Sequence, residues 1–283
     1  MRGPLNSVAI LFNPRVADAH ELAHALSTLV EQRGIGVAIC EGETEEQMSA
    51  GIPSATDLLI TLGGDGTLLR TAHFAASREI PILGVNLGKL GFLCDIGPNR
   101  ALEDVPVYLE GHYEMEERMM LKVIHSHRGQ ALSTKHALND AVVGHASVAS
   151  IIRVRASVNG NHLTTFAADG VIVATPSGST AYSFAAGGPI VHPADRQLLL
   201  TPISPHKPRF GSFVAPVGAV ISLKVESVAP AVLSVDGGTE TPVGDGDVIE
   251  VCKSEYITRL LRRDSERYFF QALRSTLKYG LES

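Results

Sequence analysis

Apolar residues in the first part of the chain form short continuous runs, separated by segments with helical spacing. Runs of this length predict strands, which span residues 8–12, 35–40, 58–62 and 80–85, and residues 58–62 should form a buried strand. Helix-like spacing or composition marks residues 17–33, 45–50, 68–76 and 99–110. Strands that alternate with helices predict a parallel sheet covered by helices, with ligands at the carboxyl ends of its strands.

From about Tyr113 onward the pattern becomes one of strands. The strands that we expect there span residues 120–124, 152–158, 171–174, 220–225, 231–235 and 248–252. Asn159-Gly160 follows one of them and is typical of a hairpin turn. Helical spacing returns near the end, where Phe270, Leu273 and Leu277 recur between residues 267 and 278. This half therefore predicts an antiparallel β-domain, followed by a helix that packs back on the first domain.

The change of pattern divides the chain into two expected domains, and its length of 283 residues suits two. Residues 1–110 form the α/β domain, with residues 258–283 packing back on it, and residues 111–257 form the β-rich domain. The content of 45% hydrophobic and 19% charged residues is that of a compact soluble protein and argues against disorder.

Charge and cysteine usage narrow the class of partner. A formal net charge of −6 argues against a nucleic-acid-binding surface. Cys40, Cys94 and Cys252 are too widely spaced for a CxxC site or a disulfide framework, which suggests the cytoplasm. The 11 histidines lack the spacing of a zinc site, and we expect none. No apolar run has membrane-spanning length and no signal-peptide pattern is present, so we expect no membrane partner.

A glycine-rich segment, Gly63-Gly64-Asp65-Gly66-Thr67, follows the third expected strand. Glycine lets backbone N–H groups approach a ligand closely, and a helix that begins nearby favours phosphate. A carboxylate repels phosphate, so Asp65 suits a metal ion, a ribose hydroxyl or the role of general base. The same composition is also ordinary in a tight turn.

Four further segments have both a local and a functional interpretation. Asn86-Leu87-Gly88-Lys89-Leu90-Gly91-Phe92-Leu93 is a second glycine loop, in which Asn86 can bind a sugar hydroxyl. The segment from Asp169 to Tyr182 leads a strand into Pro-Ser-Gly-Ser-Thr, which predicts a helix cap or a polar nest with Tyr182 stacking on a base. Asn139-Asp140 and Asp236-Gly237-Gly238 have the composition of turns.

Together these five segments stand in the order seen in NAD kinases, and the chain resembles that family over nearly its whole length. Lipid kinases and phosphofructokinases share the first loop, whereas the segment that ends at Tyr182 is specific. The resemblance implies a Rossmann-like N-terminal domain, a β-sandwich-like C-terminal domain and a nucleotide cleft between them.

The resemblance also implies a reaction and residue roles. An NAD kinase transfers the γ-phosphoryl group of ATP, with Mg²⁺ or another divalent cation, to the 2′-hydroxyl of the adenosine ribose of NAD. Asp65 would be the general base, and Asn139 and Asp140 would hold the NAD ribose, with Asp169 at the nicotinamide carboxamide. The resemblance further places at the nucleotides or their phosphates Gly63, Gly64, Gly66, Thr67, Asn86, Ser177, Ser179, Thr180, Ala181, Tyr182 and Asp236. It implies a homotetramer or homodimer as well.

Three positions depart from the commonest family pattern. Asp140 stands where Glu is usual, and its side chain is one methylene shorter. Ala167 stands where many bacterial members have Arg, which removes a positive charge near the nicotinamide end. Ala185 replaces a frequent Ser. None of these changes removes a group that the chemistry requires.

Two other functions compete with this interpretation. A lipid kinase shares the glycine loop, but membrane-binding features are absent from the sequence. A non-catalytic NADP-binding regulator needs only the nucleotide site, and retention of Asp65 argues against it. The sequence leaves open ATP or polyphosphate as donor, NADH as acceptor, feedback by NADPH and the residues that hold the metal.

Overall fold

The computed structural model describes residues 5–42, 44–88, 91–146, 150–206 and 211–279. The chain divides into two compact units, of which unit 1 contains Met1–Glu117 and Thr258–Ser283 and unit 2 contains Arg118–Ile257. The chain passes from one unit to the other within two long strands, β5 (Glu114–His127) and β16 (Asp247–Arg262).

Unit 1 is built on a parallel sheet with the strand order β2-β1-β3-β4-β16. Its other strands are β1 (Ser7–Phe12), β2 (Gly36–Glu41), β3 (Leu58–Gly63) and β4 (Ile82–Asn86). Its helices are α1 (Ala19–Glu31), α2 (Glu45–Gly51), α3 (Asp65–Ala76), η1 (Pro98–Arg100), α4 (Ala101–Leu109) and α6 (Ser265–Tyr279).

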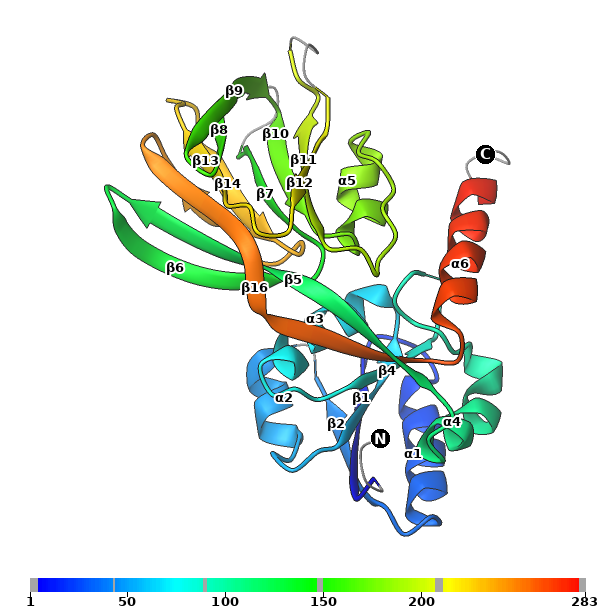
Figure 1. Cartoon of the computed structure of the whole chain (residues 1–283). Helices are drawn as coiled ribbons and strands as arrows, with labels where there is room; N and C mark the ends of the chain where they lie inside the picture. The colour runs from blue at the N-terminus through cyan, green and yellow to red at the C-terminus, as the bar shows by residue number, and fades with distance from the viewer. Residues whose placement is uncertain (1–4, 43, 89–90, 147–149, 207–210, 280–283) are drawn as a thin grey trace. The chain divides into compact units, whose positions relative to one another are not determined.

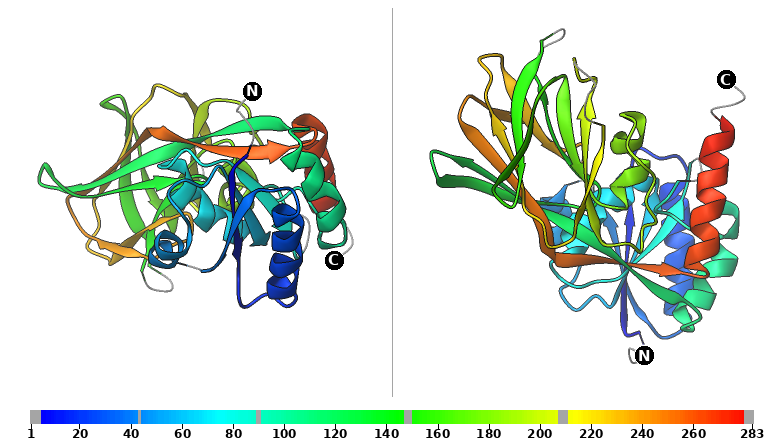
Figure 2. Two further views of the ribbon diagram at one scale, coloured as in Figure 1. Left: turned by 90° about the horizontal axis from the view of Figure 1, so that it is seen from below. Right: turned by 45° about the horizontal axis from the view of Figure 1, so that its top comes forward.

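The central strand β3 is buried along its whole length, because helices cover both faces of the sheet. Alternate residues Leu58, Ile60 and Leu62 face a core that includes Leu26 of α1 and Val105 of α4. Helices α1 and α4 lie together at that face (Figure 1, Figure 2). The buried runs of the sequence are therefore the strands of a covered parallel sheet.

Unit 2 contains two antiparallel sheets. One has the order β12-β11-β10-β7-β14-β15, and the other includes β16-β13-β8-β9. The strands are β6 (Gln130–Ala137), β7 (Asp140–His145), β8 (Ile152–Val158), β9 (Asn161–Ala168), β10 (Gly170–Ala174), β11 (Gln197–Ile203), β12 (Phe213–Pro216), β13 (Ile221–Val225), β14 (Ala231–Val235) and β15 (Thr241–Val243). The helical segments are η2 (Gly178–Thr180) and α5 (Tyr182–Ala185).

The core of unit 2 draws on both sheets. Val154 and Leu223 come from one sheet, and Val143 and Val173 come from the other. Ile172, between two core residues of β10, belongs to a smaller cluster on the opposite face. The strand β10 is consequently buried on both faces, and it leads directly into the segment that begins at Thr175.

The predicted fold class is confirmed: an α/β unit and an all-β unit are present, with a C-terminal helix that belongs to unit 1. The hairpin at Asn159-Gly160 is also confirmed, and both residues have positive φ, as a two-residue turn of this kind requires. No helix in the described part of the chain is long and apolar enough to cross a membrane.

Some predicted boundaries are wrong. Helix α3 begins at Asp65 rather than at Leu68, so Asp65 lies in the first helical turn. A negative side chain there interacts favourably with the helix dipole, which offsets the low helix propensity of Gly66. Strands β5 and β16 extend far beyond the predicted residues 120–124 and 248–252. The sequence pattern predicts no bounds for β6, β9, β11, β12 and β15.

Candidate functional site

In unit 1 the candidate site is centred on Asp65, directly after the carboxyl end of β3. Its carboxylate accepts three backbone hydrogen bonds from the second glycine loop. The Phe92 N–H donates to Oδ2 at 2.7 Å, and the N–H groups of Leu93 and Cys94 donate to Oδ1, both at 3.2 Å. An ionised carboxylate has about four acceptor positions, so this arrangement fixes Asp65 and leaves room for one further donor.

The loop that holds Asp65 is itself fixed from behind. The hydroxyl of Tyr268 on α6 donates to the carbonyl oxygens of Gly91 and Cys94, the first at 2.7 Å. The guanidinium of Arg262 donates to the Phe92 oxygen at 3.2 Å and lies over the Tyr268 ring, 4.4 Å from its centroid. The C-terminal part of the chain thus determines where the Asp65 carboxylate lies.

The glycines of the two loops are needed for different reasons. At Gly63 a Cβ would overlap Thr67, and at Gly91 it would overlap the Asp65 carboxylate, so the fold itself requires glycine there. At Gly64 a Cβ would meet nothing within 4 Å, and at Gly66 only the end of a flexible side chain, at 3.9 Å. Neither of these two has a positive φ. Nothing in the described part of the chain requires glycine at these two positions, and without side chains they leave the first turn of α3 open to a ligand.

The second loop begins beside the first. Gly63 and Asn86 are paired residues at the ends of neighbouring strands, and the Leu87 N–H donates to the Gly63 oxygen at 2.8 Å. Asn86 is buried, and its Oδ1 accepts a hydrogen bond from the Gly88 N–H at 2.8 Å. Asn86 therefore shapes the loop in addition to any contact with a sugar. The predicted loop residues Lys89 and Leu90 lie outside the described residues.

In unit 2, Asn139 and Asp140 stand at the start of β7, and Asp236 holds the backbone beneath them. Oδ2 of Asp236 accepts from the Leu138 N–H at 2.6 Å, and its Oδ1 accepts from the N–H groups of Asn139 and Asp140 at 2.8 and 2.9 Å. We predicted Asp236 as a nucleotide contact, yet its carboxylate is occupied by the chain's own amides.

Asp140 is 6% exposed and lies near a like charge. Burial raises the pKa of its carboxyl, and the charge of Asp236 raises it further, to about 7. Around neutral pH the Asp140 carboxyl is therefore only partly ionised, whereas an exposed aspartate would be fully ionised.

The segment after β10 packs against the same backbone. The Thr175 hydroxyl donates to the Leu138 oxygen at 2.5 Å and accepts from the Gly178 N–H at 3.1 Å. The predicted helix cap is wrong: neither η2 nor α5 has a side-chain cap, and the Thr175 hydroxyl instead braces the turn that leads into η2. A Cβ at Gly178 would overlap the Asn139 backbone, so the close approach of the two segments needs glycine there.

The predicted residues of this segment differ in their accessibility. Ser179 is fully buried, and its hydroxyl bonds Pro176 and Val191. Ser177 is buried and accepts from Arg118 Nη1 at 3.0 Å. Thr180 is partly exposed and donates to the Ser177 oxygen at 3.2 Å. These three side chains have roles within the fold.

Other predicted residues remain accessible. Tyr182 is 48% exposed, which suits a ring on which a base stacks. Asp169 and Ala181 are partly exposed, as is Asn139. Accessible residues and residues with a structural role are therefore close neighbours in the predicted set.

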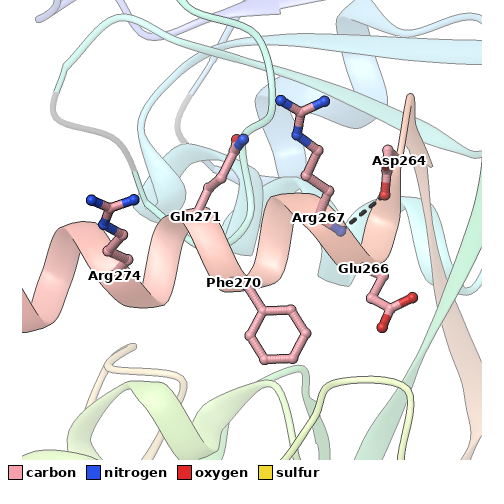
Figure 3. Close-up of a pocket in the computed structure, with 6 residues that line it drawn as sticks. All are labelled: Asp264, Glu266, Arg267, Phe270, Gln271 and Arg274. Atoms are coloured by element: carbon pink, nitrogen blue, oxygen red, sulfur yellow. Dashed lines mark hydrogen bonds between the residues drawn. The ribbon is translucent and has the colours of Figure 1, made fainter.

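Two hollows in the described part of the structure lie away from these residues. The first hollow has a volume of about 470 Å³ and lies along α6. It is lined by Asp264, Glu266, Arg267, Phe270, Gln271 and Arg274. Figure 3 shows Arg267, Gln271 and Arg274 on one side of the helix and Phe270 on the other. The second, of about 500 Å³, is lined by residues 49–54 with Phe74 and Arg78. None of the predicted site residues lines either hollow.

The sequence did not indicate several residues that shape the site. Arg262 and Tyr268 hold the loop around Asp65, and Thr175 and Arg118 hold the segment around Ser177. Thr175 lies within the sequence motif from Asp169 to Tyr182, and that motif is a signal that could have identified it. The other three act over separations of 59 to 177 residues, which local patterns do not show.

Comparison with known proteins identifies the family to which both units correspond. Residues 16–113 match the family model described as "ATP-NAD kinase N-terminal domain". Residues 138–263 match the model described as "ATP-NAD kinase C-terminal domain". Together the two matches cover well over half of the chain.

Individual relatives are similar over almost their whole length. The chain is 41% identical over 260 residues to an NAD kinase of Geotalea daltonii, covering 92% of this chain and 90% of that protein. It is 37% identical over 277 residues to an NAD kinase of Dehalococcoides mccartyi, covering 98% and 97%.

Two solved structures are similar in fold. A yeast NADH kinase complexed with NADH has a TM-score of 0.83 and 25% identity, covering 98% of this chain and 89% of that chain. An NAD kinase from Archaeoglobus fulgidus in complex with ATP has a TM-score of 0.77 and 27% identity, covering 95% and 99%.

Proposed function

This chain belongs to the NAD kinase family, and from that premise we propose that it transfers the γ-phosphoryl group of ATP to the 2′-hydroxyl of the adenosine ribose of NAD, forming NADP and ADP. The proposal rests most directly on Asp65, whose carboxylate accepts hydrogen bonds from three backbone amides. Beside it, Gly64 and Gly66 have open space where a Cβ would stand among the described residues.

Asp65 is the group that can activate the hydroxyl. With three acceptor positions occupied, its carboxylate can accept one more hydrogen bond, from the 2′-hydroxyl of the ribose. As that oxygen attacks the γ-phosphorus, its proton passes to Asp65, and the bond from the γ-phosphorus to the β–γ bridging oxygen breaks to release ADP. Because the carboxylate is fixed before the substrate arrives, little ordering is left for the reactive step.

Phosphate binding follows from the start of α3. The first N–H groups of a helix lack intrahelical partners and carry partial positive charge, which suits anionic oxygens. Gly64 and Gly66 leave this backbone open, and Thr67 lies in the same turn. We assign the phosphates of ATP to this turn.

The divalent cation fits this site as an ion carried by the nucleotide. The described residues contain no group of three or more His, Cys, Asp or Glu side chains placed to hold a metal ion. Mg²⁺ commonly keeps several waters and binds substrate phosphates with one or two carboxylates, so no such group is needed. The phosphates assigned to residues 63–67 would hold the ion, because the remaining acceptor position of Asp65 is assigned to the ribose hydroxyl. When bound, the ion supplies positive charge against the transferring phosphoryl group.

Acceptor binding is assigned to residues of unit 2. Asn139 and Asp140 bind ribose hydroxyls, Asp169 binds the nicotinamide carboxamide, and Tyr182 with Ala181 borders the base. Catalysis by such a site consists mainly of positioning and charge stabilisation.

The test is formation of NADP by the purified protein from NAD, ATP and Mg²⁺, read by an NADP-specific dehydrogenase. Polyphosphate in place of ATP identifies the donor, and a lipid acceptor such as diacylglycerol tests the lipid-kinase alternative. We expect NADP formation that depends on ATP and the cation. Binding of NADP without any turnover would show a non-catalytic regulator instead.

A further inference from the structure

The backbone of residues 138–140 has all six of its polar groups satisfied by two residues, Asp236 and Thr175, which follow the strands on either side of β7. Its three N–H groups donate to the Asp236 carboxylate. Of its oxygens, that of Leu138 accepts from the Thr175 hydroxyl, that of Asn139 from the Thr175 N–H at 2.8 Å, and that of Asp140 from the Asp236 N–H at 2.9 Å. A buried backbone that is fully paired has one well-defined conformation.

Asp236 makes this arrangement possible through an uncommon conformation. Its φ is 51°, in the left-handed region, and it is followed by Gly237 with a φ of 65°. Aspartate tolerates this region better than most residues, because its short side chain can bond nearby backbone. The turn after β14 thereby directs the carboxylate at the start of β7, about a hundred residues earlier in the chain.

We propose that Asp236 is a positioning residue for the nucleotide acceptor: its ionised carboxylate fixes residues 138–140, so that the side chains of Asn139 and Asp140 are presented to the ribose, and it places a like charge beside Asp140. This inference rests on the proposed function. It gives Asp236 a role through the chain's own backbone, in place of direct contact with the nucleotide.

The like charge has a consequence for pH. Because burial and Asp236 raise the pKa of Asp140 to about 7, Asp140 is largely neutral at pH 6 and largely ionised at pH 8. An ionised carboxylate accepts stronger hydrogen bonds from hydroxyl groups than a neutral carboxyl does. The KM for NAD should therefore fall as pH rises from 6 to 8.

The charged groups around Asp140 support this assignment. The neighbouring strands β10 and β14 contain no titratable side chain. On β6, Lys135 and His136 bond Thr241 and Ser254. Arg118 reaches the adjoining segment through Ser177. The charge that acts on Asp140 is that of Asp236.

The experiment compares Asp236→Asn with the wild type and with a matched control, Asp247→Asn. Asp247 is also in unit 2, and its carboxylate accepts from a backbone N–H, that of Gly244 at 2.9 Å, and from His125 and His127. Both variants change one atom of a carboxylate that accepts backbone hydrogen bonds, but of the two residues only Asp236 bonds residues 138–140.

For Asp236→Asn we expect the KM for NAD at pH 8 to rise about tenfold, since charge-assisted bonds to the turn are lost, with kcat nearly unchanged. The pH dependence of its KM should also shift to lower pH, because the like charge is gone and burial alone still raises the pKa of Asp140. The KM for ATP should not change. Asp247→Asn should keep the wild-type KM values and their pH profile.

Amide hydrogen exchange provides a readout that is independent of activity. Exchange at residues 138–140 should be at least about tenfold faster in Asp236→Asn than in the wild type and in Asp247→Asn. If the wild type makes NADP but Asp236→Asn keeps its KM, pH profile and exchange rates, the role of Asp236 is overturned and the proposed function stands. A wild type that makes no NADP overturns the proposed function itself.

Discussion

Single residues carry the strongest indication of a ligand. Gly64 and Gly66 have ordinary backbone angles and open space where a Cβ would be, so the fold does not account for them. Gly63 and Gly91, by contrast, are required by contacts within the chain. Four glycines that look alike in the sequence thus fall into two classes, and only the open class leaves room for a ligand beside Asp65.

The variant Gly66→Ala tests this distinction. Gly66 is inside α3, where alanine is favoured over glycine by roughly 0.5–1 kcal/mol, so the variant should be as stable as the wild type or more so. Its KM for ATP should nevertheless rise, because a methyl group would stand where phosphate approaches. Thermal unfolding and steady-state kinetics measure the two effects. Gly97→Ala, another open glycine without positive φ, is the control and should leave KM unchanged.

A second prediction at this scale concerns the redox state of the acceptor. Ala167, on β9, is small and neutral where many bacterial relatives of the family have Arg, so the nicotinamide end should accept NADH as well as NAD. We expect NADH turnover, with a selectivity gap smaller than about 2 kcal/mol, which is what one pocket contact supplies. The measurement is kcat/KM for both acceptors in the wild type and in Ala167→Arg. No NADH turnover, or the same ratio in the variant, would refute this prediction.

At the scale of elements, the C-terminal part of unit 1 supports the loop around Asp65. Arg262 at the end of β16 is 1% exposed, and its Nε donates to Glu116 of β5 at 3.0 Å. Burial lowers the pKa of Arg262, but the charge of Glu116 is the main cause that outweighs this effect and raises it. With Tyr268 of α6, Arg262 holds the loop whose amides bind Asp65.

The variant Tyr268→Phe weakens this support and leaves the Asp65 carboxylate in place. It removes the hydroxyl that donates to Gly91 and Cys94, so the loop should become less ordered. We expect kcat to fall by less than about tenfold, as a misplaced but intact base still functions, together with a loss of roughly 1–3 kcal/mol in unfolding free energy. Kinetics and urea unfolding give both numbers. A fall as large as that from losing the Asp65 carboxylate would mean that Tyr268 acts directly on the substrate.

The elements also show what could be predicted from the sequence. The continuous apolar runs gave the buried strands of unit 1 correctly, because strands covered on both faces need no polar positions. Strand β16 was predicted only over its apolar part, since charged residues such as Lys253 and Glu255 interrupt the rest. The start of α3 was missed because glycines carry no periodic signal. The links from Asp236 to residues 138–140 and from Tyr268 to Gly91 join distant parts of the chain, so no local pattern contains them.

For the whole molecule, the exposed surface of unit 2 suggests association. Strand β12 is at the edge of its sheet, and Val214 on it is 42% exposed. An apolar strand at the edge of a sheet is a natural place for another chain to pair.

We therefore predict a homodimer or homotetramer, as the family resemblance also implies. Light scattering at micromolar concentration should give a multiple of the mass of one chain, 30.1 kDa. Val214→Lys should shift the mass toward the monomer if β12 forms the contact. A wild-type mass of 30.1 kDa would contradict the prediction.

The central claim is that this molecule phosphorylates NAD with Asp65 as the general base, and kcat of Asp65→Asn tests it most directly. The matched control is Asp57→Asn, whose carboxylate also accepts backbone bonds in unit 1, from Asn6 and Ser7 at 2.8 and 3.0 Å. Loss of a general base typically lowers the rate by about a hundredfold or more, so we expect a fall of that size for Asp65→Asn and wild-type kcat for Asp57→Asn. A kcat for Asp65→Asn within a few-fold of the wild type would contradict the account.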